Sequence, residues 1–159
     1  MAIAIGNKIL LHFELGNESY GLVLNDLSQI IILDNILKLP KCPPCIYGVG
    51  NYKGVIVTVV DTPYIFNKLK PEKFYIGLLN GKYSHIGLII SDKINTIAIG
   101  SIDTGDFQYN SDNNTSMEFL EGEFLIENKL IQIISANKLY NYLLESVNYY
   151  LRKEFGLLT

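Results

Sequence analysis

The sequence predicts a mainly β fold that is closed by a single C-terminal helix. Short segments rich in β-branched and aromatic residues recur at roughly ten-residue spacing, and glycine, asparagine and proline stand between them. A helical hydrophobic pattern appears only near the end of the chain. Many short strands with little helix indicate small barrels or a sandwich rather than βαβ units.

Composition bounds the class of protein. A chain of 159 residues suggests one domain, or two small lobes that share a core, and 48% apolar residues with a mean hydropathy of +0.20 supply that core. Sixteen acidic and thirteen basic residues give a net charge of −3, which argues against a nucleic-acid-binding surface. The longest apolar runs, Ile30–Leu33 and Val55–Val60, are shorter than the roughly 18 residues of a membrane span. The first residues lack the features of a signal peptide, so we expect a cytoplasmic protein without direct membrane insertion.

In the first half of the chain, the predicted strands are Ile9–Leu15, Ser19–Leu24, Ile30–Leu33 and Gly54–Val60. Gly16 and Asn17 separate the first two, which predicts a hairpin. Asn25 offers an N-cap for a single helical turn through Gln29, so a short helix is expected near residues 25–30. Pro40, Pro43 and Pro44 predict irregular backbone. Because residues 55–60 are nearly all β-branched, this strand is expected to be buried on both faces.

In the second half, the predicted strands are Phe74–Leu79, His85–Ser91, Asn95–Gly100, Phe119–Ile126 and Leu130–Ser135. Asn80-Gly81 is a hairpin signal, and Tyr109–Thr115 predicts a loop. A closing helix is expected over residues 136–155, capped by Ser135 and ended by Gly156. Its apolar face is formed by Leu139, Leu143, Val147, Tyr150 and Leu151.

Cys42 and Cys45 form a Cys-x-x-Cys pair. A redox dithiol of this type needs a helix N-terminus to lower the pKa of one thiol, and the glycines that follow predict no helix there. A zinc site would need four ligands, and His12 and His85 lie far away in sequence. We therefore expect no metal and no cofactor, and a dithiol redox protein remains the less favoured alternative.

Other candidate motifs are also incomplete. Gly48, Gly50 and Gly54 precede a strand rather than a helix, so they predict a tight turn instead of a phosphate-binding loop. Asp103-Thr104-Gly105 resembles one half of an aspartic-protease pair, whose chemistry needs two carboxylates. No catalytic residues are predicted.

Three segments carry a resemblance to a known family. The segment Leu15–Leu22 resembles the opening LG-x-x-x-YG hairpin of the CheW-like chemotaxis coupling domain. The segment Pro43–Asp61 resembles the signature P-x-x-I-x-G-V-x-N-L-R-G-x-I-x-P-V-x-D of that family. Leu78–Gly81, leading to Gly87–Asp92, is similar to its second hairpin. The resemblance covers roughly residues 9 to 145.

The resemblance implies two small SH3-like β-barrel lobes that share a core, with approximate boundaries 9–68 and 72–145 in a single domain spanning 1–159. It implies a non-catalytic adaptor that couples the cytoplasmic tip of a chemoreceptor to the regulatory domain of a chemotaxis histidine kinase. A receptor helix would bind between the lobes, and the kinase would pair barrel to barrel.

Departures from the family pattern locate the predicted interaction surface. The signature arginine is Lys53 here, and the glutamate usual at the end of the short helix is Gln29. Lysine cannot reproduce the bidentate grip of arginine on a carboxylate. The predicted partner-binding residues are Gln29, Asn51, Lys53, Gly54 and Val55. Asn51 and the glycines serve equally well as turn formers, and a diverged interaction module with another signalling partner is the first alternative.

Overall fold

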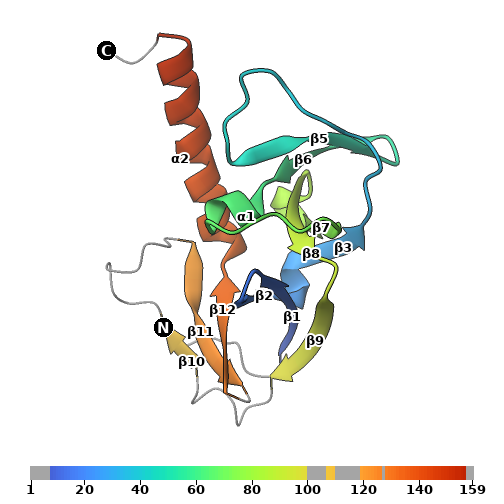
Figure 1. Cartoon of the computed structure of the whole chain (residues 1–159), viewed down its shortest axis with the longest axis vertical. Coiled ribbons are helices and arrows are strands. Elements are labelled where there is room, and N and C mark those ends of the chain that lie inside the picture. Colours follow the sequence, from blue (N-terminus) through green and yellow to red (C-terminus); the bar gives the residue numbers. More distant parts are fainter. Residues whose placement is uncertain (1–7, 100–106, 110–118, 127, 157–159) are drawn as a thin grey trace.

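The computed structural model describes residues 8–99, 107–109, 119–126 and 128–156 as two six-stranded sheets and a long terminal helix (Figure 1). The strand order of the first sheet is β10 (Phe107–Tyr109), β11 (Leu120–Ile126), β12 (Lys129–Ile134), β2 (Glu18–Val23), β1 (Lys8–Leu15) and β9 (Ile94–Ile99). The strand order of the second is β3 (Leu27–Ile31), β7 (Phe74–Leu79), β8 (Ile86–Ser91), β6 (Val55–Val60), β5 (Ile46–Tyr52) and β4 (Ile36–Leu37). The helices are η1 (Leu24–Asp26), α1 (Thr62–Ile65), η2 (Gly81–Tyr83) and α2 (Ala136–Glu154).

The two sheets form an end lobe, built from β1, β2 and β9–β12, and a middle lobe, built from β3–β8. The end lobe takes its strands from both ends of the described chain. The two lobes therefore do not divide near residue 70, as the expected boundaries 9–68 and 72–145 implied. The physical reason is strand pairing: β9 pairs with β1, and β12 pairs in parallel with β2. Strands from the second half of the chain thus cover both free edges of the first hairpin.

One apolar cluster joins the two lobes, as the prediction of a shared core required. Phe13 and Tyr20 of the end lobe lie in the same cluster as Val60 and Leu88 of the middle lobe. Phe66, which follows α1, is 2% exposed, and its ring centroid lies 4.1 Å from that of Tyr20. Burial of this cluster couples the lobes through apolar area removed from water.

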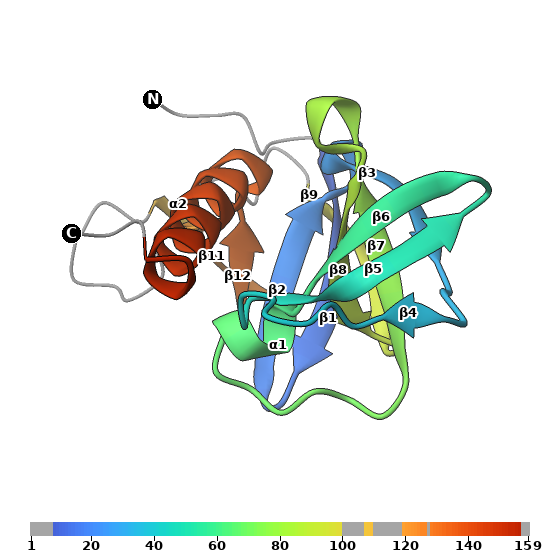
Figure 2. The same cartoon turned by 90° about the horizontal axis from the view of Figure 1, so that it is seen from above.

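Helix α2 begins and ends as the sequence predicts. The Ser135 hydroxyl accepts a hydrogen bond from the Lys138 amide at 3.2 Å, and Gly156 has the positive φ of +68° typical of a residue just past a helix. Leu139 and Leu143 are buried, whereas Leu151 is 38% exposed. Figure 2 shows α2 beside β11 and β12, with the β5–β6 hairpin extending away on the other side.

The β5–β6 hairpin corrects two expectations. Gly48 and Gly50 do not form a tight turn but lie within β5. Position 48 requires glycine because a Cβ there would lie 2.5 Å from the Leu37 carbonyl oxygen of the neighbouring strand β4. Strand β6 is not buried on both faces along its length, since Val55 is 54% exposed. Its neighbour β8 pairs with it only from Thr58 onward, so the start of β6 is paired with β5 alone and extends beyond β8.

Helix α1 has no counterpart in the sequence prediction. The Asp61 carboxylate accepts a hydrogen bond from the Tyr64 amide at 3.1 Å, and Pro63 occupies the first turn. The predicted Asn80-Gly81 connection between β7 and β8 is present and contains η2. Most of the predicted loop Tyr109–Thr115 and the triplet Asp103-Thr104-Gly105 lie outside the described residues.

Candidate partner-binding surface

The tip of the β5–β6 hairpin is a two-residue turn. Tyr52 pairs with Val55 across the hairpin, and Lys53 and Gly54 between them have φ values of 50° and 86°. Two successive positive φ values are characteristic of a type I′ turn, which matches the twist of the flanking strands. The Asn51 side-chain oxygen accepts a hydrogen bond from the Gly54 amide at 2.8 Å. Asn51 and Gly54 therefore shape the turn, which presents Lys53 at its apex.

Gln29 and Lys53 are connected through a residue that the sequence prediction did not include. The Tyr52 hydroxyl donates a hydrogen bond to the Gln29 side-chain oxygen at 2.9 Å. The Lys53 ammonium lies 5.2 Å from the centroid of the Tyr52 ring, within the range of a cation–π contact. Tyr52 stands where the family signature has leucine, and this substitution was the sequence signal that could have identified it.

The short helix expected near residues 25–30 differs in extent. Helix η1 covers only Leu24–Asp26, and its N-cap is Val23 rather than Asn25. Gln29 lies in strand β3, where it pairs with Leu78 across a register shift. The chain enters the strand early because Leu27 turns inward to the core and is 8% exposed. Gln29 thus reaches Tyr52 from an edge strand, not from a helix end.

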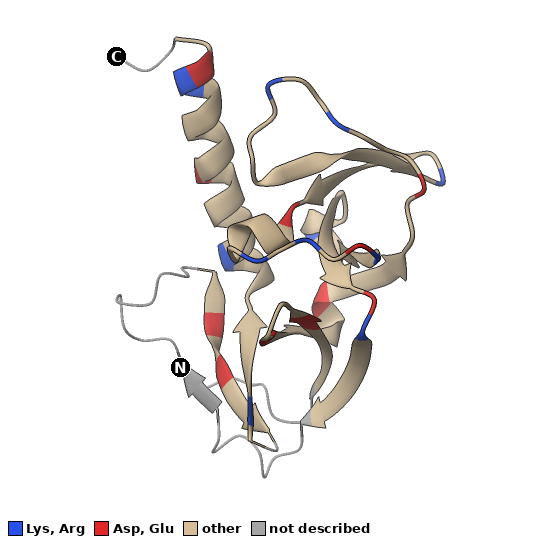
Figure 3. Ribbon diagram, viewed as in Figure 1, with Lys and Arg blue, Asp and Glu red and all other residues tan. Residues whose placement is uncertain are grey.

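Exposed apolar side chains follow both partners of this contact along the chain. Val55 and Ile56 are 54% and 60% exposed, and Ile32, just beyond β3, is 65% exposed. Lys53 is the only charged residue between residues 46 and 60, and the ribbon of this hairpin in Figure 3 is coloured almost entirely as uncharged residues. We call the set Gln29, Tyr52, Lys53, Val55 and Ile56 the hairpin surface. Exposed apolar area beside an aromatic residue, with few charged groups, is the composition that protein interfaces favour.

Of the predicted residues, the structure brings all five to one end of the middle lobe. Gln29, Lys53 and Val55 have exposed side chains there, whereas Asn51 has a turn-forming role. Ile56 and Tyr52 are additions. Their exposure follows from the length of the hairpin relative to β8, a tertiary feature that local sequence does not encode.

The two cysteines lie apart from this surface. Cys45 is 5% exposed within the shared core, and Cys42 lies close enough to donate to the Ile46 carbonyl at 3.9 Å. Burial raises the pKa of both thiols above its ordinary value. A raised pKa reduces the thiolate fraction, which is the opposite of what a redox dithiol requires. Strand β5, not a helix, follows Cys45. The geometry disfavours the dithiol alternative.

The described residues contain no cluster of three or more histidine, cysteine, aspartate or glutamate side chains able to hold a metal ion. Within the same part of the chain, no helix has the length and apolar character needed to cross a membrane.

Comparisons with known proteins agree on one family. The profile of the CheW-like domain matches residues 10–143. The chemotaxis protein CheW of Klebsiella aerogenes is 37% identical over 57 residues, which make up 36% of this chain and 34% of that protein. The chemotaxis protein CheW of Treponema pallidum is 26% identical over 101 residues, 59% of each chain. The chain thus matches between about a third and three fifths of the length of these relatives.

The same likeness extends to three dimensions. The crystal structure of scaffolding protein TtCheW from Thermoanaerobacter tengcongensis matches with a TM-score of 0.69 and 27% identity, covering 81% of this chain and 89% of that one. The shared architecture is the two-lobe SH3-like fold, which confirms the predicted fold class. With a family profile that spans most of its length, the chain belongs to the CheW-like domain family.

Proposed function

We propose that this protein is a non-catalytic cytoplasmic adaptor that couples a chemoreceptor to a chemotaxis histidine kinase. Membership of the CheW-like family supports a role in chemotaxis scaffolding. The observation that carries the proposal further is the hairpin surface, where exposed Val55 and Ile56 flank Lys53 and Tyr52. A monomeric protein gains nothing in stability from exposing these apolar side chains together, whereas burying them against a partner removes their area from water.

The hairpin surface suits a partner with an apolar centre and a carboxylate or carbonyl at its edge. Lys53 has no carboxylate within ion-pair distance among the described residues, so its ammonium is available to an acceptor on the partner. The rigid turn fixed by Asn51 and Gly54 keeps this group in place before binding. Preorganisation of this kind lowers the entropy cost of association.

The test is capture of the host chemotaxis kinase and of receptor cytoplasmic fragments by the tagged full-length chain. Lys53→Glu should weaken partner binding about tenfold to a hundredfold in calorimetry, because it replaces an attraction by a repulsion at the interface. Thermal unfolding should remain unchanged. Lys73→Glu, at an exposed site on the same lobe outside the hairpin surface, is the matched control. If Lys53→Glu and the unmodified protein bind the partner with equal affinity, the partner-binding surface does not include Lys53.

A second candidate is an interaction module of the same fold that contacts a different signalling protein. The specific observation is that Gln29, at the position of the family glutamate, pairs with Tyr52 rather than with Lys53, which stands at the position of the family arginine. A neutral pair offers a partner other hydrogen-bonding groups than an ion pair does. Capture of neither the kinase nor the receptor fragments would favour this candidate over the coupling role.

A further inference from the structure

The end lobe contains a pocket that the adaptor function does not use. Its volume is about 400 Å³, within the range of small-molecule sites. Polar side chains from three strands and their connections border it, and four isoleucines complete the wall. The isoleucines are Ile94, Ile97, Ile126 and Ile131.

Strand alternation explains how polar groups come to this place. Side chains two residues apart share a face of a strand. On β1, His12 and Glu14 share the face of Leu10, which is buried in the end-lobe cluster with Ile131. The β1–β9 register places His12 directly opposite Asn95. The pocket is thus the polar end of the interior of the end lobe.

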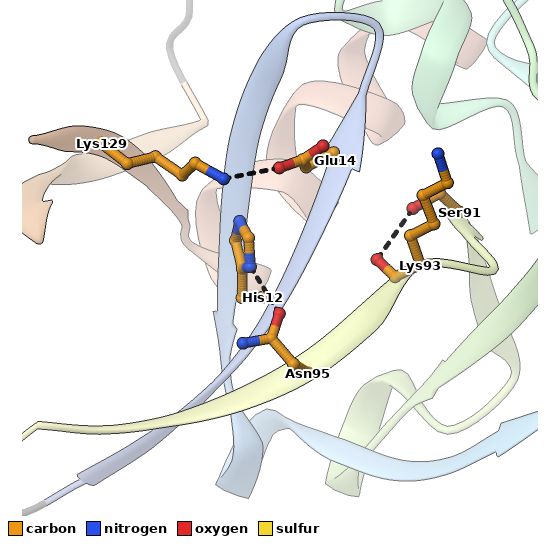
Figure 4. Close-up of polar contacts among 6 residues, drawn as sticks. All are labelled: His12, Glu14, Ser91, Lys93, Asn95 and Lys129. Atoms are coloured by element: carbon orange, nitrogen blue, oxygen red, sulfur yellow. Dashed lines mark hydrogen bonds and ion pairs between the residues drawn. The ribbon is translucent and has the colours of Figure 1, made fainter. Parts of the chain in front are cut away.

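His12 has a buried nitrogen without a partner. The side chain is 7% exposed, and its Nδ1 lies 2.7 Å from the Asn95 side-chain oxygen. Since that oxygen can only accept, Nδ1 carries the hydrogen. The Nε2 atom has no hydrogen-bond partner within the described chain. Figure 4 shows it on the side of the ring that faces Glu14 and Lys129. Buried polar atoms are nearly always paired, so this one calls for a ligand group.

The charges around the pocket favour an anion. Lys129 Nζ lies 2.8 Å from a Glu14 carboxylate oxygen. Hydrogen bonding to Lys129 holds the pKa of Glu14 below its ordinary value, and the positive charge of Lys93 acts in the same direction. Among the described lining residues, two lysines accompany one carboxylate, which leaves a positive excess there in a chain whose net charge is −3. A proton added at Nε2 would turn His12 into a third cationic donor.

We propose that this pocket binds a small aliphatic carboxylate, whose anionic group is held by His12, Lys93 and Lys129 while its hydrocarbon part lies against the isoleucines. On binding, Nε2 takes one proton from solvent and donates it as a hydrogen bond to the ligand oxygen. Asn95 holds the ring through Nδ1 in both charge states. Glu14 restrains Lys129 and opposes the ligand charge.

The test titrates the isotope-labelled full-length chain with butanoate, hexanoate and octanoate, following the His12 ring nitrogens by NMR. Affinity should rise about fourfold for each methylene that the pocket buries. Because a histidine changes charge between about pH 5 and 8, hexanoate binding should tighten on going from pH 8 to pH 6, by at most about tenfold per unit. The Nε2 signal should move to the imidazolium position. Absence of any His12 change with all three acids would overturn the proposal.

Variants and analogues distinguish the chemistry. Glu14→Gln should bind hexanoate several-fold more tightly, because it removes the opposing charge, and Lys93→Met should bind it more weakly. His12→Gln should retain weaker binding without the pH dependence. Lys73→Met is the control and should behave as the unmodified chain. Equal affinity for hexanamide and hexanoate would show that the pocket does not recognise an anion. The same conclusion would follow if the unmodified chain preferred hexylammonium to hexanoate and Glu14→Gln lost that preference.

Discussion

The β5–β6 hairpin of the middle lobe and the β11–β12 hairpin of the end lobe are built alike. In each, the second strand pairs in parallel with a neighbour over a short stretch, at Thr58–Val60 with β8 and at Ile131–Ile133 with β2. Both hairpins therefore extend beyond their neighbours and expose apolar side chains. Val55 is 54% exposed in one, and Leu130 is 48% exposed in the other.

The two hairpins differ in the lysine near each tip. Lys53 contacts only the Tyr52 ring among the described residues, whereas Lys129 is held by Glu14 across the lobe. Lys53 stands at the apex of an exposed turn, and Lys129 borders the end-lobe pocket. In the two proposals above, the first lysine serves a protein partner and the second serves a small ligand. The proposed difference depends on whether a carboxylate on a facing strand holds the lysine.

The largest expected effect tests whether the two surfaces belong to one cooperative unit. Phe66→Ala should lower the free energy of unfolding by about 3–5 kcal/mol, since Phe66 packs on Tyr20 and Phe119 where the lobes meet. Urea unfolding followed by circular dichroism and tyrosine fluorescence should still show a single transition. Tyr64→Ala in the adjacent helix α1, at a side chain 56% exposed, should cost far less. Two separated transitions would show that the lobes, and hence the two surfaces, are independent.

A smaller effect should be confined to the middle-lobe hairpin. Asn51→Ala removes the side-chain acceptor of the Gly54 amide and should cost about 1 kcal/mol of stability. Partner binding should weaken as the turn that carries Lys53 loosens, while hexanoate binding in the end lobe should stay unchanged. Asn51→Asp keeps an acceptor of the same shape and should behave nearly as the unmodified chain. If both variants lose equal affinity, the side-chain amide contacts the partner directly.

The sequence predicted the local elements better than their assembly. Leu139, Leu143 and Ser135 identify α2 because periodicity and capping are local signals. The parallel pairing of β12 with β2 joins segments more than a hundred residues apart, and no local pattern encodes it. The prediction therefore divided the lobes in sequence order.

The two candidate binding surfaces were likewise predicted only as far as local sequence allows. The turn at Lys53-Gly54 was readable in part from residue types, because Asn51 and Gly54 are turn formers. The role predicted for Lys53 came from the family resemblance and stays a prediction. The exposure of Val55 and Ile56 depends on where β8 begins to pair, so the burial predicted for that strand was wrong at its first residues. The position of His12 opposite Asn95 likewise depends on the β1–β9 register. Leu11 and Phe13, the neighbours of His12 in sequence, are apolar and give no sign of this contact.

The smallest expected effect concerns the ionic contact that joins the end lobe to the segment after α1. Glu18 accepts hydrogen bonds from the Tyr20 hydroxyl at 2.8 Å and from the Gln132 amide at 3.2 Å, and it lies 3.1 Å from the Lys68 ammonium. The Tyr20 hydroxyl, followed by Lys68 and Gln132, lowers the pKa of Glu18. A lowered folded-state pKa gives stability that is present above the unfolded-state value of 4.5 and is lost as the pH falls through the folded-state value.

Glu18→Gln should therefore cost stability at pH 7 and cost progressively less as the pH falls below the ordinary carboxyl range. Because the Glu18 side chain is 46% exposed, the cost at pH 7 should not exceed about 1 kcal/mol. Urea unfolding of the unmodified protein and of Glu18→Gln between pH 7 and about pH 3 measures the difference in their free energies of unfolding. Lys68→Met is the matched variant. In its background, Glu18→Gln should cost less, and the remaining cost should no longer depend on salt concentration. A difference that stays constant with pH would mean that Glu18 acts through shape alone. The Lys68–Glu18 pair would then contribute nothing electrostatic to stability, unlike what we infer for the Lys129–Glu14 pair at the pocket.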